Sequence, residues 1–431
     1  MQDHRRSTPR TDHVLADPRL RAAAARLGDP LVKGVVVAVL DRCRAGEIAP
    51  ADVTAAALAA LPPVATGMRR VVNATGVVVH TNLGRAPLSD AAVGALAVAA
   101  GATDVELDLT TGRRGARGRT ALAALAAAVP DAGGVHVVNN GAAALALVTC
   151  ALAMGRNVVI ARGEMVEIGD GFRIPELIGS LGATLREVGT TNRVRLADYE
   201  RAVDAETAFV LKVHPSNFVV SGFTSTVEVA ALASLPVPVV VDIGSGLLAP
   251  HPRLPGEPSA AAALRAGADL VTASGDKLLG GPQCGLLLGR AELVHRLRRH
   301  PFARALRVDK LTLAALEATL TGPPTPVARA LASTPEELMA RAVRLAASLS
   351  PAVAATAVAS TAAVGGGGAP GVELPSAAVV VPAALAGPLR RGEPPVVGHT
   401  RRGGLLLDLI AVPPGEDDAL ADAVRRAAGG S

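Results

Sequence analysis

Residues 274–285 read SGDKLLGGPQCG, a glycine-rich turn with Lys277 near its centre. The turn follows an apolar run at residues 270–273 that has the composition of a buried strand. A lysine amine buried between strands is costly unless it is paired or loses its charge. Desolvation lowers the pKa of such an amine, which can then form a Schiff base with an aldehyde. Taken alone, the turn leaves a second interpretation open, in which Lys277 is an exposed loop residue.

A carboxylate follows another apolar strand, 35 positions before Lys277. Residues 239–246 read VVVDIGSG and place Asp242 at the carboxyl end of this strand. Ligands of open α/β sheets bind at that end of the strands. Pyridoxal phosphate needs a carboxylate against its pyridinium nitrogen, so that the ring stays protonated and withdraws electrons. The alternative for Asp242 is an ordinary helix N-cap or turn residue.

A third strand leads into a turn that suits a phosphate group. Residues 138–144 read VNNGAAA and predict a strand, a tight turn and the start of a helix. Free backbone N–H groups at a helix N-terminus bind phosphate, and Ser274 could donate a further hydrogen bond. The chain contains no GxGxxG after any of the predicted strands and no GxxxxGK[ST]. The order phosphate turn, carboxylate, lysine therefore favours a fold-type-I pyridoxal-phosphate enzyme.

Composition limits the alternatives. The chain has 431 residues, of which 50% are hydrophobic and 19% charged, so it is not a disordered protein. Aromatic residues make up only 1%, which disfavours binding of nucleic acid by base stacking. Cys43, Cys150 and Cys284 lie far apart, which excludes a disulfide scaffold and disfavours a cysteine zinc site; we expect no metal.

The charge pattern bears on location and partners. The polar N-terminus lacks the apolar region of a secretory signal, and no unbroken apolar run is long enough to span a bilayer. We therefore expect a cytoplasmic protein that does not contact a membrane. Residues 1–70 hold ten arginines and Lys33 against seven acidic residues, and so carry most of the net charge of +5. This excess is either a solvated helical face or a surface for a polyanion.

The pattern of apolar residues predicts three parts. Residues 1–65 form a helical module, because apolar residues recur at helical spacing between residues 14 and 60 and a Pro-Pro pair follows. Residues 66–321 form a three-layer α/β/α domain of parallel strands, and residues 322–431 form a small α+β domain. The Gly365–Gly368 run would ordinarily be a flexible linker. The strands of the large domain are predicted at residues 135–138, 157–161, 184–188, 208–213, 237–243, 270–273 and 285–288.

One long segment carries a family resemblance. Residues 72–89, VNATGVVVHTNLGRAPLS, closely resemble the opening of the catalytic domain in the bacterial selenocysteine synthase (L-seryl-tRNA(Sec) selenium transferase) family. The similarity continues to the C-terminus, and it includes the glycine run, which is then a family segment and not a linker. The segments that carry it are residues 162–169, 172–175, 212–218, 242–246, 274–285, 304–312, 364–368 and 374–376.

The resemblance implies a function. The family converts L-seryl-tRNA(Sec) to L-selenocysteinyl-tRNA(Sec) by pyridoxal 5'-phosphate-dependent β-elimination of the serine hydroxyl and addition of selenium from selenophosphate. It also implies a homo-oligomer, a homodecameric ring of dimers, and a tRNA-binding role for residues 1–65. One alternative is a paralogous pyridoxal-phosphate lyase that acts on a small amino acid or amino-sugar phosphate without tRNA. Another is a non-catalytic binding protein of the same fold.

The resemblance also assigns roles to residues. Lys277 would hold the cofactor as a Schiff base and remove the Cα proton, and Asp242 would pair with the pyridine nitrogen. From its position after a predicted strand, His214 either contacts the cofactor, protonates the leaving hydroxyl or serves a structural role. The implied phosphate ligands are Asn140, Gly141, Ala142 and Ser274, and the implied selenophosphate site consists of Arg85, Arg304 and Arg307.

Three sets of charged residues remain, and two of them allow two interpretations. Glu164, Glu167 and Arg173 either act at the mouth of the site or fix a loop by ion pairing, and we favour ion pairing. Arg304 and Arg307 are three residues apart, so a helix over this segment would present both on one face. The densest basic cluster either approaches a phosphate or consists of ligand-free loop residues; its members are Arg113, Arg114, Arg117 and Arg119.

Overall fold

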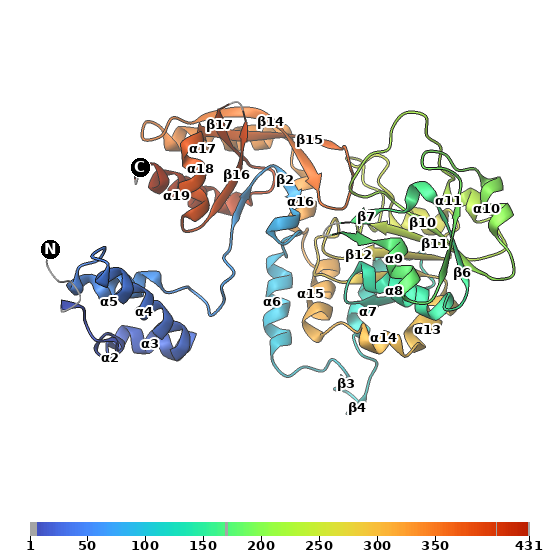
Figure 1. Cartoon of the computed structure of the whole chain (residues 1–431), viewed down its shortest axis with the longest axis horizontal. Helices are drawn as coiled ribbons and strands as arrows, with labels where there is room; N and C mark the ends of the chain where they lie inside the picture. Colours follow the sequence, from blue (N-terminus) through green and yellow to red (C-terminus); the bar gives the residue numbers. More distant parts are fainter. Residues whose placement is uncertain (1–6, 169–170, 402, 430–431) are drawn as a thin grey trace. The chain divides into compact units, whose positions relative to one another are not determined.

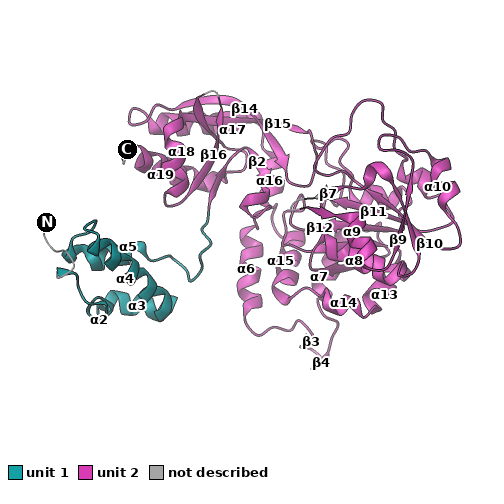
Figure 2. Ribbon diagram, viewed as in Figure 1, with its two compact units in different colours: residues 1–70 teal, residues 71–431 magenta. Residues whose placement is uncertain are grey.

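The computed structural model describes residues 7–168, 171–401 and 403–429 and divides the chain into two units (Figure 2). The first ends at Arg70 and the second begins at Val71. The first unit is helical, as predicted, and its core includes Leu20, Val36 and Leu40. Its α-helices are α2 (Thr11–Leu15), α3 (Pro18–Leu27), α4 (Asp29–Arg44) and α5 (Val53–Ala60).

The second unit contains a seven-stranded sheet in the order β5-β13-β12-β11-β10-β6-β9. All seven predicted strands are present, and β6 and β9 have the predicted bounds. The neighbours pair in parallel except at β13, which runs antiparallel to both β12 and β5, so the prediction of parallel strands is wrong there. The strands are β5 (Gly134–Val138), β6 (Asn157–Ala161), β9 (Thr184–Val188), β10 (Thr207–Val213), β11 (Val239–Gly244), β12 (Leu270–Ser274) and β13 (Gly285–Gly289).

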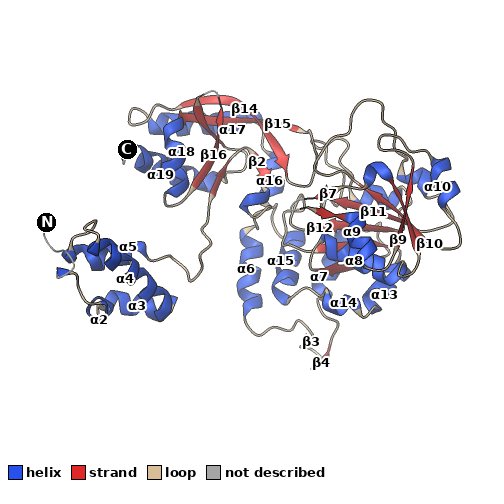
Figure 3. Cartoon of the chain, viewed as in Figure 1, coloured by secondary structure: helices blue, strands red, loops and turns tan. Residues whose placement is uncertain are grey.

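Helices cover both faces of this sheet, which confirms the three-layer architecture (Figures 1 and 3). Alternate strand residues enter opposite cores: Val159 faces α7, α12 and α15, whereas Val158 and Ile160 face α8, α9 and α13. The helices of this domain are α6 (Asp90–Ala100), α7 (Arg119–Ala128), α8 (Gly141–Leu152), α9 (Ile174–Ser180), α10 (Leu196–Ala202), α11 (Val229–Leu232), α12 (Ala260–Arg265), α13 (Ala291–Arg299), α14 (Phe302–Ala305) and α15 (Lys310–Thr321).

A six-stranded sheet in the order β1-β16-β17-β15-β14-β2 forms the second core of this unit. Its strands β1 (Val72–Ala74) and β2 (Val77–Val79) come from the range predicted for the large domain. They pair in parallel with β16 and β14, so this sheet extends beyond residues 322–431. The other elements are α16 (Pro326–Ala332), α17 (Pro335–Leu349), β14 (Thr356–Gly365), β15 (Glu373–Pro382), α18 (Ala386–Arg391), β16 (Val396–Arg401), β17 (Gly404–Asp408) and α19 (Asp417–Gly429).

Two short hairpins lie outside the sheets. They are β3 (Leu107–Asp108) with β4 (Arg113–Arg114), and β7 (Glu167–Ile168) with β8 (Phe172–Arg173). The segment of the family resemblance at residues 162–169 ends on Gly169, which lies outside the described residues. No helix in the described ranges is long and apolar enough to cross a bilayer.

His136, on β5, gives a prediction about stability. Both of its ring nitrogens are buried without a hydrogen-bond partner, and burial, with a smaller effect from Arg298, lowers its pKa from 6.5 to about 4. The native state therefore resists protonation between these values while the unfolded chain does not, so stability falls as the pH drops through that window. Between pH 7.5 and 4.5 this histidine should lower the free energy of unfolding of the wild type by about 2–3 kcal/mol. His136→Leu should not show this decrease.

The measurement is urea unfolding of the cofactor-free protein and of the variant at both pH values. Carboxylates that titrate in the same range affect both proteins equally, so the difference between the two isolates His136. An equal loss of stability in the two proteins would show that a water or a protein group compensates the ring.

Candidate active site

Lys277 lies in the turn between the antiparallel strands β12 and β13. Its side chain is buried, with 8% exposed, so the interpretation as an exposed loop lysine is wrong. Among the residues that the structure describes, none forms a hydrogen bond or ion pair with its Nζ. Burial lowers the pKa of the amine below its ordinary value, although the charges of Asp242 and Asp276 oppose this effect. The turn therefore presents a desolvated amine that is free to react.

Asp242 belongs to β11, whose neighbour β12 leads into the Lys277 turn. Its Oδ1 accepts hydrogen bonds from Thr272 Oγ1 at 3.0 Å and from the Gly244 N–H at 3.1 Å. Neither donor belongs to a helix, so Asp242 is not an N-cap; the bond from Gly244, two residues on, is that of a turn aspartate, and this part of the alternative stays open. Within the described part of the chain, Oδ2 accepts no hydrogen bond. Burial raises the pKa of this carboxyl, although the hydrogen bond from Thr272 opposes this effect, and a cationic partner at Oδ2 would favour its ionised form.

The predicted phosphate turn adjoins the end of β12. Asn140 is the N-cap of α8, and its Oδ1 accepts a hydrogen bond from the Ala143 N–H at 2.8 Å. The backbone N–H groups of Gly141 and Ala142 follow at the open end of the helix. A Cβ at Gly141 would lie 2.6 Å from Ser274 Oγ, so glycine is needed for the hydroxyl to reach this end. Asn140 thus holds the helix end, and Ser274 lies beside it.

The glycine run between β14 and β15 is part of the same site. Gly367 has a φ of +84°, and a Cβ there would lie 2.6 Å from Lys277 Nζ. A Cβ at Gly368 would meet Leu278 and Ser245 at 3.0 and 3.1 Å. The run is therefore not a flexible linker; it packs against the turn that carries Lys277.

His214 follows β10 and connects to the site through its backbone. Its N–H donates to the Asp242 carbonyl oxygen at 2.9 Å. Its ring Nε2 lies 3.1 Å from Oε2 of Glu257, a residue that the sequence analysis did not single out. Glu257 follows no recognisable motif, and only the folded chain reveals its role as the partner of His214.

The three candidate arginines differ in their surroundings. Arg85 Nη1 contacts Asp276 Oδ2 at 2.6 Å, one residue from Lys277. Arg304 is on α14, and within the described residues its side chain forms no hydrogen bond or ion pair. The helix ends at Ala305, so the prediction that Arg304 and Arg307 share a helix face is wrong.

A bridge to the phosphate turn fixes Arg307 instead. Arg307 pairs with Val138 in an isolated antiparallel bridge, and the Leu306 carbonyl accepts from the Asn139 N–H at 3.1 Å. These backbone contacts hold Arg307 next to the N-terminus of α8. Of the three arginines, Arg85 therefore lies beside the Lys277 turn and Arg307 beside the N-terminus of α8.

Glu106 forms ion pairs with two arginines of the basic cluster. Its carboxylate contacts Arg114 at 2.9 Å, Arg117 at 3.1 Å and Arg307 at 3.6 Å. Arg119 lies 3.4 Å from Asp104. These arginines therefore have carboxylate partners; that they approach a phosphate stays a prediction.

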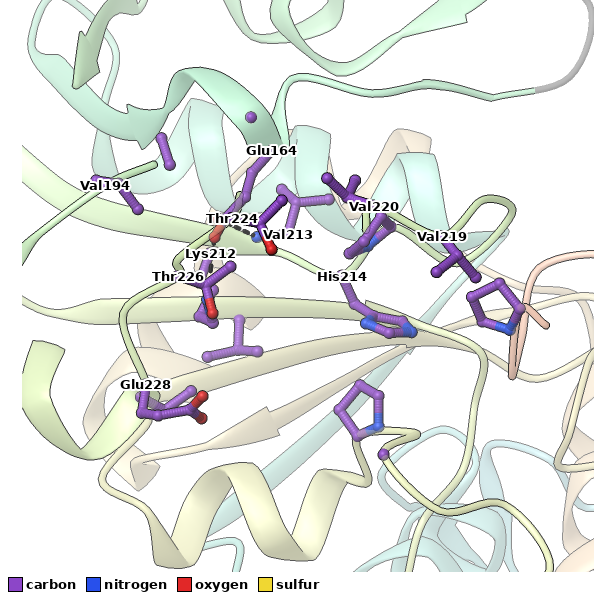
Figure 4. Close-up of a pocket in the computed structure, with 18 of the residues that line it drawn as sticks. Glu164, Val194, Lys212, Val213, His214, Val219, Val220, Thr224, Thr226 and Glu228 are labelled. Atoms are coloured by element: carbon purple, nitrogen blue, oxygen red, sulfur yellow. Dashed lines mark hydrogen bonds and ion pairs between the residues drawn. The ribbon is translucent and has the colours of Figure 1, made fainter. Parts of the chain in front are cut away.

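The acidic loop is fixed by ion pairs, as we favoured. Glu164 accepts hydrogen bonds from Lys212 Nζ and from the Val213 N–H, each at 3.0 Å, and Arg173 contacts Glu167 at 2.7 Å. Glu164 and Lys212 lie together on the wall of a cavity of about 830 Å³, which His214 also lines (Figure 4). Glu257 and Ala369 also line this cavity, whereas no residue of the Lys277 turn does.

Comparison with known proteins decides the family. A model of the L-seryl-tRNA selenium transferase family matches residues 71–413, and one described as selenocysteine synthase N terminal matches residues 5–44. The chain belongs to the L-seryl-tRNA selenium transferase family. Family membership agrees with the resemblance and with the architecture of a fold-type-I enzyme. The cofactor of the family is pyridoxal 5'-phosphate.

Relatives in this family are similar over most of their length. The chain is 45% identical to L-seryl-tRNA(Sec) selenium transferase of Moorella thermoacetica over 391 residues, covering 85% of this chain and 83% of the relative. It is 41% identical to the enzyme of the same name from Geobacter sulfurreducens, covering 97% and 98%. Among solved structures, D-glucosaminate-6-phosphate ammonia-lyase matches with a TM-score of 0.59 and 20% identity, covering 84% of this chain and 97% of that one. This structural likeness supports the fold alone.

Proposed function

We propose that this chain converts L-seryl-tRNA(Sec) to L-selenocysteinyl-tRNA(Sec), with pyridoxal phosphate held at Lys277 and selenophosphate as selenium donor. The observation that carries the proposal is the unpaired, buried amine of Lys277 beside a strand-end carboxylate. The family relatives, at 45% identity, favour this activity over a lyase that acts without tRNA.

The residues present fit the cofactor. Asp242 Oδ2 is open to a protonated ring nitrogen, and the helix end at Gly141 and Ala142 with Ser274 Oγ is open to a phosphate. Asn140 contributes by capping that helix, and His214 by holding the Asp242 backbone. When bound, pyridoxal phosphate supplies an electron sink for the carbanion formed at Cα of serine.

Lys277 has two tasks in this scheme. Its amine would hold the cofactor through the aldehyde, and it is also the base that would remove the Cα proton of the serine. Burial lowers the pKa of the amine, which increases the uncharged fraction that both tasks require. Lys277 stays within the site while the serine hydroxyl leaves Cβ and selenium adds there.

The arginines suit a phosphate-bearing donor. Because the carboxyl of the serine is esterified to tRNA, the site needs no arginine for a free carboxylate. Arg85, Arg304 and Arg307 are therefore available for selenophosphate, whose oxygens match the guanidinium donors. Arg304 has the fewest competing contacts of the three within the described residues.

Removal of one of these arginines should weaken donor binding selectively. We expect Arg304→Ala to raise KM for selenophosphate by about 10–100-fold, because one charge-assisted contact is lost, and to leave KM for seryl-tRNA(Sec) unchanged. Steady-state kinetics with each substrate varied in turn measures this. Arg296→Ala, an exposed arginine of α13, is the matched control. A rise in both KM values, or in neither, contradicts the assignment.

The helical unit is the proposed tRNA-binding part, and its basic excess supports this role. Filter binding with tRNA(Sec) and tRNA(Ser) tests it on the full chain. We expect tighter binding of tRNA(Sec). Equal binding of the two tRNAs, or binding of neither, would contradict a tRNA(Sec) substrate. With a tRNA substrate we propose a reaction in the cytoplasm, and the homodecameric ring of dimers stays a prediction from the resemblance.

A further inference from the structure

The glycine run, at the end of β14 of the six-stranded sheet, packs closely against Lys277. Gly366 approaches Thr81 so closely that a Cβ would collide with its hydroxyl, and Gly367 leaves no room for a Cβ beside Lys277 Nζ. The run follows β14, whereas Lys277 follows β12 of the other sheet. Contact between them therefore depends on how firmly the segment from Gly366 to Val372, here the glycine loop, is held.

Glu257 holds this loop at one point. Its side chain is completely buried, and its Oε2 accepts a hydrogen bond from the Ala369 N–H at 2.7 Å. Ala369 is a non-glycine residue with a φ of +47°, a left-handed conformation that needs support from its surroundings. A single carboxylate oxygen therefore fixes the strained residue next to Gly368.

The same carboxylate oxygen of Glu257 also contacts His214. Glu257 Oε2 lies 3.1 Å from His214 Nε2, and the His214 N–H donates to the Asp242 carbonyl at 2.9 Å. Its second oxygen, Oε1, is buried and has no hydrogen-bond partner among the described residues. A carboxylate buried with one oxygen unsatisfied is costly, so its placement is not explained by stability alone.

We propose that Glu257 is a positioning residue, which holds the glycine loop over Lys277 and orients His214 beside Asp242. The proposal rests on the proposed function only in taking Lys277 as the cofactor-binding residue. Glu257 touches neither the reacting atoms nor Lys277 by hydrogen bond; it acts through Ala369 and His214. Its contacts connect the glycine loop, which follows β14, with His214, which follows β10 of the other sheet.

Two substitutions separate positioning from charge. Glu257→Ala removes both hydrogen bonds, whereas Glu257→Gln keeps a carbonyl oxygen that can accept from the Ala369 N–H. Glu228→Ala is the matched control, because Glu228 is an exposed glutamate that lines the same cavity as Glu257 (Figure 4). All three changes are made in the full chain.

The first readout is hydrogen–deuterium exchange of the cofactor-free protein. In Glu257→Ala we expect exchange at residues 366–372 to accelerate by at least about 10-fold, since the amide of Ala369 loses its acceptor. Glu257→Gln and Glu228→Ala should exchange like the wild type. This readout does not depend on activity, so it tests the loop even if the proposed function fails.

The second readout is turnover of the cofactor-loaded enzyme. We expect kcat of Glu257→Ala to fall by about 10²-fold with KM for selenophosphate unchanged, and Glu257→Gln to restore most of it. Wild-type exchange and kcat in Glu257→Ala would overturn the proposal. So would a Glu257→Gln enzyme whose loop is protected but whose kcat equals that of Glu257→Ala, because charge and not position would then matter. A wild-type enzyme that binds cofactor at Lys277 but does not act on seryl-tRNA(Sec) would instead contradict the proposed function.

Discussion

Lys277→Ala should abolish both covalent binding of pyridoxal phosphate and turnover of seryl-tRNA(Sec), with kcat reduced by at least about 10³-fold. The substitution removes the amine that binds the aldehyde and the base that takes the Cα proton. It should not unfold the chain, because a buried amine without a hydrogen-bond partner does not stabilise the fold. Borohydride reduction followed by mass spectrometry locates the pyridoxyl group, and aminoacyl-tRNA analysis measures turnover.

Lys310→Ala provides the control for this experiment. Lys310 donates a hydrogen bond to the Gly101 carbonyl at the start of α15, away from the turn. This variant should keep the adduct and the activity. A pyridoxyl group found on Lys33, Lys212 or Lys310 of the wild type would contradict the assignment; for Lys212 the structure adds a reason against it, because Glu164 holds its amine at 3.0 Å.

The sequence predicted the large sheet well because its strands are continuous apolar runs. Buried strands such as β6 and β13 show no other pattern, and glycines lie at or near their ends. β9 is the exception, because it is only partly buried and includes Arg186 and Glu187. Local signals also located Lys277, Asp242 and the helix end at Gly141, since each follows its own strand. β11 and β12 are parallel neighbours, so Asp242 and Lys277 follow strand ends at the same edge of the sheet. β5 ends at this edge too because β13, which separates it from β12, runs antiparallel to both; the sequence did not predict that arrangement.

Pairings between distant segments could not be predicted in this way. Nothing in residues 72–79 indicates that β1 and β2 join a sheet formed mostly by residues 356–408. The spacing of Arg304 and Arg307 suggested a helix, but backbone pairing of Arg307 with Val138 ends it. Glu257 escaped notice because its partners, His214 and Ala369, are 43 and 112 positions away. Such contacts depend on tertiary packing, which overrides local pattern.

Asp242→Asn should have the second-largest effect on the reaction, a fall in kcat of about 10²–10³-fold, comparable to the loss of one preorganised electrostatic contact. Asparagine keeps an Oδ1 that accepts from Thr272 and Gly244, at 3.0 and 3.1 Å in the wild type, so β11 should fold normally. What is lost is the negative charge at Oδ2, and with it the protonated ring nitrogen that withdraws electrons from Cα. Borohydride trapping at Lys277 should persist while turnover collapses.

Thr272→Val separates the charge of Asp242 from its orientation. Valine removes the hydrogen bond to Oδ1 but leaves the carboxylate ionisable, so its effect on kcat should be much smaller than that of Asp242→Asn. The absorbance spectrum of the bound cofactor, recorded for both variants, reports the state of the ring independently of turnover. If Asp242→Asn retained the wild-type spectrum and kcat, the carboxylate would not face the ring nitrogen. The raised pKa that burial gives this carboxyl would then reflect only its place in the sheet.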